Sequence, residues 1–139
     1  MALNLLKLCV GAKSIDDLIA WQNQLQRTYG RVFHTTRMVP KRDGELLDNG
    51  SIYWVINGQI QCRQTLLDIE VFNDRLGKRR CHLILDPSPI LTRIRAQRPF
   101  QGWRYLTSAD APSDLAAGAE IEQDMPDEMR AELSALGLI

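Results

Sequence analysis

The sequence predicts a single α+β domain, built on an antiparallel or mixed sheet with two main helices. Three observations predict this fold class. With 139 residues, the chain has the size of one ordinary domain, and no internal repeat or linker divides residues 1–139. Its composition, 45% hydrophobic and 24% charged, is typical of a globular protein. Most of its apolar runs are short and strand-like, and Asn57-Gly58 between two of them favours a β-hairpin.

The N-terminal third predicts a strand, a helix and a second strand. Residues 3–10 are apolar on nearly both sides, as in a central strand. A helix is expected over 14–29, because Ser14 is a good N-cap and Gly30 favours termination. Its buried face is expected to comprise Ile15, Leu18, Ile19, Leu25 and Tyr29, with Trp21 or Gln22 bridging the gap. A strand over 32–39 ends at Pro40, and a short helix follows within 41–48.

The middle of the chain predicts an antiparallel meander of three strands. A two-residue turn at Asn57-Gly58 joins 52–56 to 59–63. This register pairs Trp54 with Gln61, and it forms a core face from Tyr53, Val55, Ile60 and Cys62. The opposite face, around Trp54, is half polar, so a helix or a ligand is expected there. The second strand is expected to continue through a bulge to Phe72, and the third covers 80–85.

The last part of the chain predicts little regular structure. Three prolines make 86–102 irregular, and a last strand is expected at 103–106. Residues 107–139 form an acidic C-terminal segment that ends in a helix beginning at Pro126. The buried stripe of that helix is expected to consist of Met129, Leu133 and Leu136.

The charge distribution is strongly uneven, although the formal net charge is zero. Residues 27–104 carry fourteen lysines and arginines against seven acids. Residues 105–139 carry eight acids against one base. This division predicts either an anionic partner for the middle of the chain or an acidic tail that folds back over it.

Several classes of function are excluded by the motifs. The candidate metal ligands, Cys9, His34, Cys62, Cys81 and His82, lack the spacing of a metal site, and no cofactor is expected. Phosphate-binding glycine loops are absent, and a Cys62 nucleophile on a core face would be inert. No apolar run is long enough to cross a bilayer, and the N-terminus lacks the layout of a signal peptide. Three widely spaced cysteines make no disulfide framework, so we expect a cytoplasmic protein without membrane contact.

The clearest candidate site combines basic and aromatic residues. Guanidinium groups bind phosphates bidentately, and aromatic rings stack on unpaired bases. The predicted ligand-binding residues are Arg37, Lys41, Arg42, Trp54, Arg63, Arg98, Trp103 and Arg104. The alternative is that Trp103 and Tyr105 are core residues and that the arginines pair with the acidic tail.

Five segments of the chain resemble a known family. They are Leu6-Lys7-Leu8-Cys9-Val10-Gly11, Thr36-Arg37-Met38-Val39-Pro40-Lys41-Arg42, Gly50-Ser51-Ile52-Tyr53-Trp54-Val55-Ile56, Arg63-Gln64, and Arg98-Pro99-Phe100-Gln101-Gly102-Trp103-Arg104-Tyr105-Leu106. Together they resemble the bacterial domain of unknown function 1489, a family that implies a single small domain but no activity. The architecture is also similar to the PUA and ASCH group of small RNA-associated barrels, which implies a small PUA-like barrel as the alternative fold.

Three functions follow as hypotheses. The first is a non-enzymatic binding module for RNA or another phosphate-bearing ligand, with no catalytic residue. The second is an enzyme that acts on a small anionic substrate and uses Tyr53, His34 or Cys62. The third is a partner-binding protein or homo-oligomer, in which the acidic C-terminal helix docks on the basic face of a neighbour.

Overall fold

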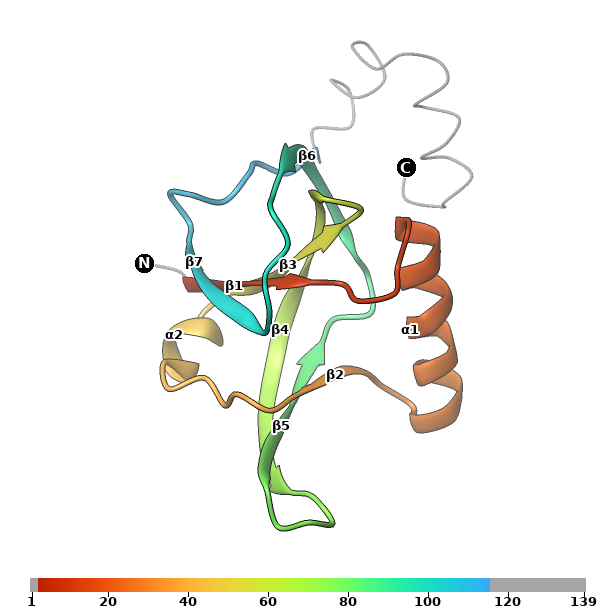
Figure 1. The fold of residues 1–139 in the computed structure, drawn as a ribbon, viewed down its shortest axis with the longest axis vertical. Coiled ribbons are helices and arrows are strands. Elements are labelled where there is room, and N and C mark those ends of the chain that lie inside the picture. Colours follow the sequence, from red (N-terminus) through yellow and green to blue (C-terminus); the bar gives the residue numbers. More distant parts are fainter. Residues whose placement is uncertain (1–2, 116–139) are drawn as a thin grey trace.

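The computed structural model describes residues 3–115, and one long strand pairs with three other strands of its sheet (Figure 1). The described elements are β1 (Leu3–Leu8), α1 (Ile15–Tyr29), β2 (Val32–Thr36), α2 (Asp43–Leu46), β3 (Ser51–Ile56), β4 (Gln59–Asn73), β5 (Arg79–Leu85), β6 (Ile90–Ala96) and β7 (Trp103–Thr107). The 15-residue β4 pairs with β3 and β6 through its first half and with β5 through its second half. No described helix is long and apolar enough to span a membrane.

The sheet is mixed, as the sequence predicts, and it is open. Six of its seven strands are paired side by side in the order β2-β5-β4-β3-β1-β7. The remaining strand, β6, pairs with β4. The ladder between β1 and β3 is parallel, and the other ladders are antiparallel. The alternative of a small closed PUA-like barrel is wrong, because no ladder joins the edge strands β2 and β7 among the described residues. The chain bends at Arg37 and Met38, directly after β2, so that strand ends before it can pair further.

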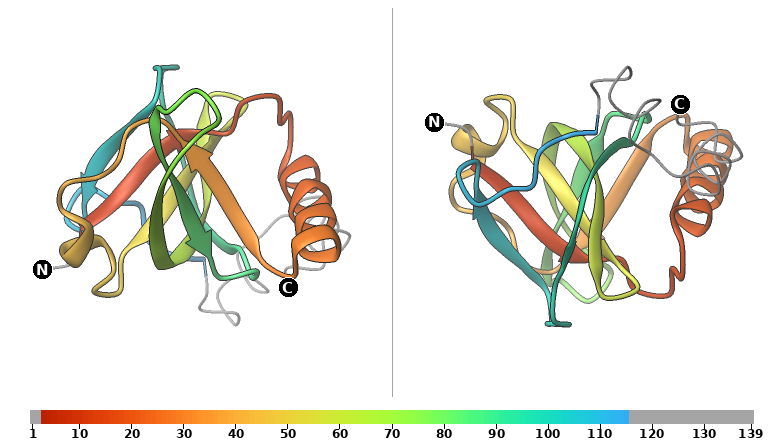
Figure 2. Two further views of the ribbon diagram at one scale, coloured as in Figure 1. Left: turned by 90° about the horizontal axis from the view of Figure 1, so that it is seen from below. Right: turned by 90° about the horizontal axis from the view of Figure 1, so that it is seen from above.

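The two halves of the sheet nevertheless curl around one main core. This core combines side chains of the β1–β3 half with side chains of the β2–β5 half, among them Leu5, Ile52, Trp54, Val32, Leu83 and Leu85. The strands twist strongly, and α1 stands at one side of them (Figure 2). The carbonyl of Met38 accepts hydrogen bonds from Trp103 Nε1 at 2.9 Å and from the Cys81 thiol at 3.8 Å. Side-chain contacts therefore connect the two edges that backbone pairing leaves open.

The predicted hairpin forms, but a bulge changes its register. Asn57 and Gly58 have φ values of 53° and 76°, which suits the expected turn. A register shift between Val55 and Trp54 leaves Gln61 without a strand partner, so Trp54 lies opposite Cys62. Both side chains therefore belong to the main core, and the predicted grouping of Cys62 with Tyr53 is wrong. The face around Trp54, on which a helix or a ligand was expected, is covered by α1 and by the second half of the sheet.

Helix α1 begins and ends as predicted, but its buried face differs. Ser14 precedes it without a side-chain capping bond, and Gly30 ends it with φ of 75°. The buried residues are Ile15, Leu18 and Gln22, whereas Trp21 and Tyr29 are exposed. Gln22 therefore bridges the gap in the apolar stripe, and the burial of Tyr29 is not found.

Two further predictions need correction, and one lies outside the described residues. The region 86–102 contains β6, because residues after Pro89 pair with the first half of β4. The strand expected over 32–39 is confined to β2, whereas the short helix expected within 41–48 is confirmed as α2. The predicted helix from Pro126, like most of the acidic segment, lies outside the described residues.

Candidate functional site

The loop of residues 37–42, which follows β2, docks on the edge strand β7. The Tyr105 hydroxyl accepts hydrogen bonds from the backbone N–H groups of Lys41 and Arg42, at 3.1 and 3.2 Å. The Arg42 guanidinium lies 5.4 Å from the centre of the Tyr105 ring. Near the start of the loop, Trp103 Nε1 donates a hydrogen bond to the Met38 carbonyl. The fold thus brings the predicted residues of this loop next to those of β7, which are 61 or more positions away in the sequence.

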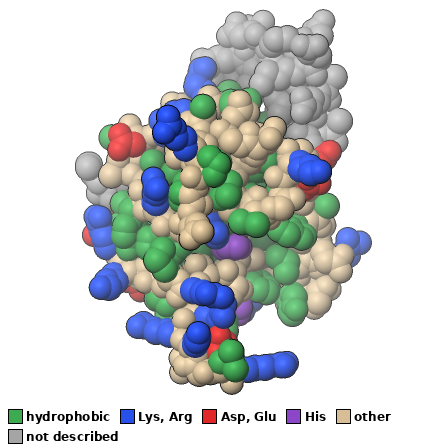
Figure 3. Space-filling view, in the orientation of Figure 1, with side chains coloured by type: hydrophobic (Ala, Val, Ile, Leu, Met, Phe, Trp, Pro, Cys, Tyr) green, Lys and Arg blue, Asp and Glu red, His purple; other side chains and the backbone are tan. Residues whose placement is uncertain are grey.

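Four predicted cations are exposed in this part of the molecule. The side chains of Arg37, Lys41, Arg98 and Arg104 form no ion pair with any residue in the range 3–115. The Arg104 guanidinium lies 4.5 Å above the Phe100 ring, which leaves its charge in solvent. Arg42 is also exposed but forms an ion pair with Glu45, which raises the pKa of the guanidinium. Lysine and arginine side chains predominate over acidic ones on the face in Figure 3. We call Arg37, Lys41, Arg42, Arg98 and Arg104 the basic surface; Arg104, together with Phe100, lies on the opposite face of β7 from Tyr105 and the 37–42 loop.

Arg63 lies apart from this group and is occupied by internal bonds. Its guanidinium makes two hydrogen bonds of 2.7 Å to the Asp114 carboxylate and one of 2.8 Å to Ser51 Oγ. The hydrogen bond to Asp114 is also the main reason that the pKa of Arg63 is raised. Asp114 belongs to the predicted acidic segment of residues 107–139. The expected pairing of an arginine with that segment therefore occurs at Arg63.

The two predicted tryptophans are core residues and offer no ring face on the basic surface. Trp54 is 3% exposed and Trp103 is 9% exposed. Trp54 lies on the face of β3 that packs into the main core, and its indole Nε1 donates to Gln64 Oε1 at 2.8 Å. Stacking on the basic surface is therefore restricted to Tyr105 and Phe100.

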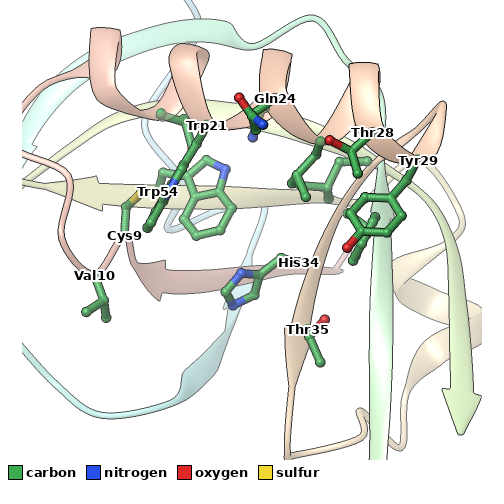
Figure 4. A pocket seen from close by; sticks show the side chains of 14 residues that line it. Cys9, Val10, Trp21, Gln24, Thr28, Tyr29, His34, Thr35 and Trp54 are labelled. Atoms are coloured by element: carbon green, nitrogen blue, oxygen red, sulfur yellow. The ribbon is translucent and has the colours of Figure 1, made fainter.

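A pocket of about 590 Å³ lies between α1 and the sheet (Figure 4). Trp21 and Tyr29 line it from α1, His34 from β2 and Trp54 from β3. None of the described residues that line it carries a charge. The pocket exists because the curled sheet brings β2 over β3, with the His34 and Trp54 rings 5.4 Å apart and nearly perpendicular. This contact joins strands that are not neighbours in the sheet, so sequence patterns did not indicate it.

His34 is the chemically distinctive group of the pocket. Its Nε2 atom is buried and has no hydrogen-bond partner among residues 3–115. Burial, and to a smaller extent the positive charge of Lys7, lower the pKa of the imidazole to about 4. Lys7 lies on β1 opposite both Trp54 and Trp103, and burial lowers its own pKa as well. At neutral pH His34 is therefore an uncharged imidazole.

A buried amide pair holds the wall of the pocket in place. Gln22 of α1 and Gln64 of β4 exchange two hydrogen bonds of 2.6 and 2.7 Å. Gln64 also accepts from the Trp54 indole and donates to the carbonyl of Asp86 at 3.0 Å. These residues were missed as site residues, although an amide on the buried stripe of α1 and an indole N–H that needs a partner were usable signals.

The thiols and the phenol give no support to nucleophilic chemistry. Burial raises the pKa of the Cys62 thiol to about 12 and that of Cys9 to about 11, so both are protonated at neutral pH. Burial also raises the pKa of Tyr53. In the described part of the chain, no group of three or more histidine, cysteine, aspartate or glutamate residues could hold a metal ion.

Comparison with known proteins places the chain in a family without a known activity. No curated protein and no solved structure matches it, so the similarity to PUA and ASCH barrels is not confirmed. The family model that matches covers residues 5–139, nearly the whole chain. The chain therefore belongs to the family described as "Protein of unknown function (DUF1489)".

Proposed function

We propose that this protein is a non-enzymatic binding module for a phosphate-bearing ligand, with single-stranded RNA as the ligand to test first. The observation that carries the proposal is the exposed, unpaired state of Arg37, Lys41 and Arg104 within the described part of the chain. Cations that already form ion pairs would have to break them before they could bind a phosphate. These three need not do so.

The arrangement of the basic surface suits an extended anion better than a compact one. The loop of residues 37–42 is anchored to β7 through the Tyr105 hydroxyl, so its cations are presented from a fixed backbone. The Tyr105 ring is partly exposed between them and can contact a base, while Arg104 and Phe100 form a second cation–ring pair. Phosphate contacts along such a surface are electrostatic and need no particular base sequence.

The test is binding of a fluorescently labelled, mixed-sequence single-stranded RNA to the full chain, followed by anisotropy at increasing salt. We expect log Kobs to fall linearly with log salt concentration, with a slope near −0.7 for each phosphate neutralised. The double variant Arg37→Glu with Lys41→Glu should bind more weakly and show a slope smaller by about 1.4, since two phosphate contacts are lost.

The matched control is the double variant Arg75→Glu with Lys78→Glu. Both residues are exposed in the turn between β4 and β5, and neither forms an ion pair among the described residues. The control makes the same change of charge at another place. No binding at low salt, or equal weakening by both double variants, would contradict the proposal.

A further inference from the structure

The pocket between α1 and the sheet has the dimensions and rigidity of a ligand site. Its volume of about 590 Å³ falls within the range of small-molecule pockets in proteins. The Trp54 wall is fixed by the Gln22–Gln64 amide pair, and the Tyr29 ring at the far end packs 5.3 Å from Phe33. The site is thus largely formed before any ligand enters.

The lining of the pocket selects for flat, uncharged ligands. Aromatic rings come from three elements, namely Trp21 and Tyr29 of α1, His34 of β2 and Trp54 of β3 (Figure 4). No lining residue is charged, so an anionic or cationic group inside the pocket would lose its hydration without compensation. Trp21 is more than half exposed at the rim, a position from which its ring can cover a planar ligand.

The unpartnered nitrogen of His34 adds a requirement for a polar ring edge. A buried polar atom without a partner is unfavourable, and a ligand that supplies a hydrogen bond removes this penalty. The amide of Gln24 and the hydroxyl of Thr28, also at the pocket, have no hydrogen-bond partner among residues 3–115. Gln24 and Thr28 are exposed and can bond to water, but an alkyl chain would leave His34 Nε2 unsatisfied. A heterocycle with ring nitrogens and exocyclic groups can bond to all three.

We propose that this pocket binds an uncharged planar heteroaromatic ring of the nucleobase type. The ring lies among Trp21, Tyr29 and Trp54 and forms a hydrogen bond to His34 Nε2. Covalent chemistry is not part of this binding, because the nearby Cys9 thiol is protonated at neutral pH. The site differs from the basic surface in its residues and in its chemistry, so it stands whether or not the basic surface binds RNA.

The test uses the four nucleosides adenosine, guanosine, cytidine and uridine, which carry the ring without a phosphate. Titration into the full ¹⁵N-labelled chain should produce saturable NMR shifts at the Trp21 indole and at backbone amides of α1 and β2, with Kd of about 1 mM or tighter for at least one nucleoside. Ribose 5-phosphate, which has the phosphate but no ring, should not shift these signals.

Variants assign the binding to the pocket. Trp21→Ala removes an exposed ring and should weaken binding about tenfold. His34→Phe keeps an aromatic ring but removes the nitrogen, and should weaken binding about fivefold. Gln24→Ala should weaken it, whereas Gln26→Ala on the same helix, outside the pocket, should leave it unchanged. The double variant Arg37→Glu with Lys41→Glu should also leave nucleoside binding unchanged, so failure of the basic surface is distinguishable from failure of the pocket.

Two results would overturn the inference. One is the absence of saturable shifts with all four nucleosides. The other is unchanged nucleoside affinity in both Trp21→Ala and His34→Phe, each with a native-like spectrum. Binding of a medium-chain alkane in place of the nucleosides would equally count against it, because such a ligand has no group that can bond to the His34 nitrogen.

Discussion

At the scale of single residues, His34 destabilises the fold through a buried nitrogen without a described partner, and the same nitrogen can bond to a ligand. Its imidazole is held uncharged by burial and by the charge of Lys7, and its Nε2 has no partner in residues 3–115. Such groups are uncommon in folded proteins and are often retained for function. The same feature makes the folded state sensitive to acid.

The pKa of His34 predicts the direction of that sensitivity. The folded-state pKa of about 4 lies below the ordinary value of 6.5. Between these two values the unfolded chain takes up a proton that the folded chain does not, so stability falls as the pH is lowered from 6.5 toward 4. At pH 4.5 the loss from this one group is expected to be about 2 kcal/mol. His34→Phe should remove it, as measured by urea unfolding at pH 7 and pH 4.5.

His82 provides the control for this measurement. It is the second histidine of the chain, and its ring stacks on Phe72 and bonds to Thr35. His82→Phe should keep the acid-dependent loss of stability that His34→Phe removes. Equal pH dependence in the wild type and in His34→Phe would show that the imidazole titrates normally in the folded chain.

At the scale of elements, local patterns predicted well where a turn or an end depends on adjacent residues. Asn57-Gly58 formed the hairpin turn, and Gly30 ended α1 in the left-handed conformation. Predictions were wrong where the outcome depends on partners distant in sequence. The bulge at Gln61 and the pairing of β6 with β4 both depend on contacts with neighbouring strands. The two prolines before β6 led to the wrong prediction that this region is irregular.

In the candidate site, too, the sequence predicted the features that depend on single residues and missed those that depend on distant partners. The basic residues of 37–42 and 104 were recognisable from composition, because surface cations need only be exposed. The burial of Trp54 was not predicted, since its face of β3 is covered by residues of α1, β2 and β5 that are distant from it in the sequence. A helix or a ligand was predicted on the face around Trp54, but the lining of the pocket by His34 and Phe33 was not, because it depends on curling of the sheet.

Gly50 is the junction of three elements and predicts a sharp requirement for glycine. A Cβ atom at this position would lie 2.1 Å from the Leu46 carbonyl oxygen of α2 and 2.3 Å from the Leu3 carbonyl oxygen of β1. Both neighbours are backbone atoms, so relief requires the elements to separate. Gly50→Ala should therefore lower the free energy of unfolding by about 3 kcal/mol or more, as measured by chemical denaturation.

Gly44 is the matched control within α2. A Cβ atom there meets nothing within 4 Å, and alanine favours helix more than glycine by about 0.5–1 kcal/mol. Gly44→Ala should leave stability unchanged or slightly raised. Similar destabilisation by both alanine variants would contradict the junction argument.

At the scale of the whole molecule, the uneven charge of the sequence is only partly neutralised inside the described fold. The described ion pairs are Arg31–Glu70, Arg42–Glu45, Arg63–Asp114 and Arg80–Asp74. Of these, only the pair of Arg63 involves an acid from the predicted acidic segment. That pair connects the last described residues to the centre of the sheet, since Asp114 also bridges to Thr92 and Leu115 bonds to Leu91.

The Arg63–Asp114 pair should be stronger in solution than the Arg31–Glu70 pair, and double-mutant cycles can measure the difference. Its side chains are 21% and 30% exposed, against 42% for both partners of the Arg31–Glu70 pair, while both pairs are bidentate with similar distances. Lower exposure weakens screening by solvent, so the cycle with Arg63→Met and Asp114→Asn should give a coupling free energy of about 1–2 kcal/mol. The control cycle with Arg31→Met and Glu70→Gln should give no more than about 1 kcal/mol. If the two coupling energies are equal, burial of the pair does not secure the C-terminal end of the described fold, and residues 107–115 are held by other contacts.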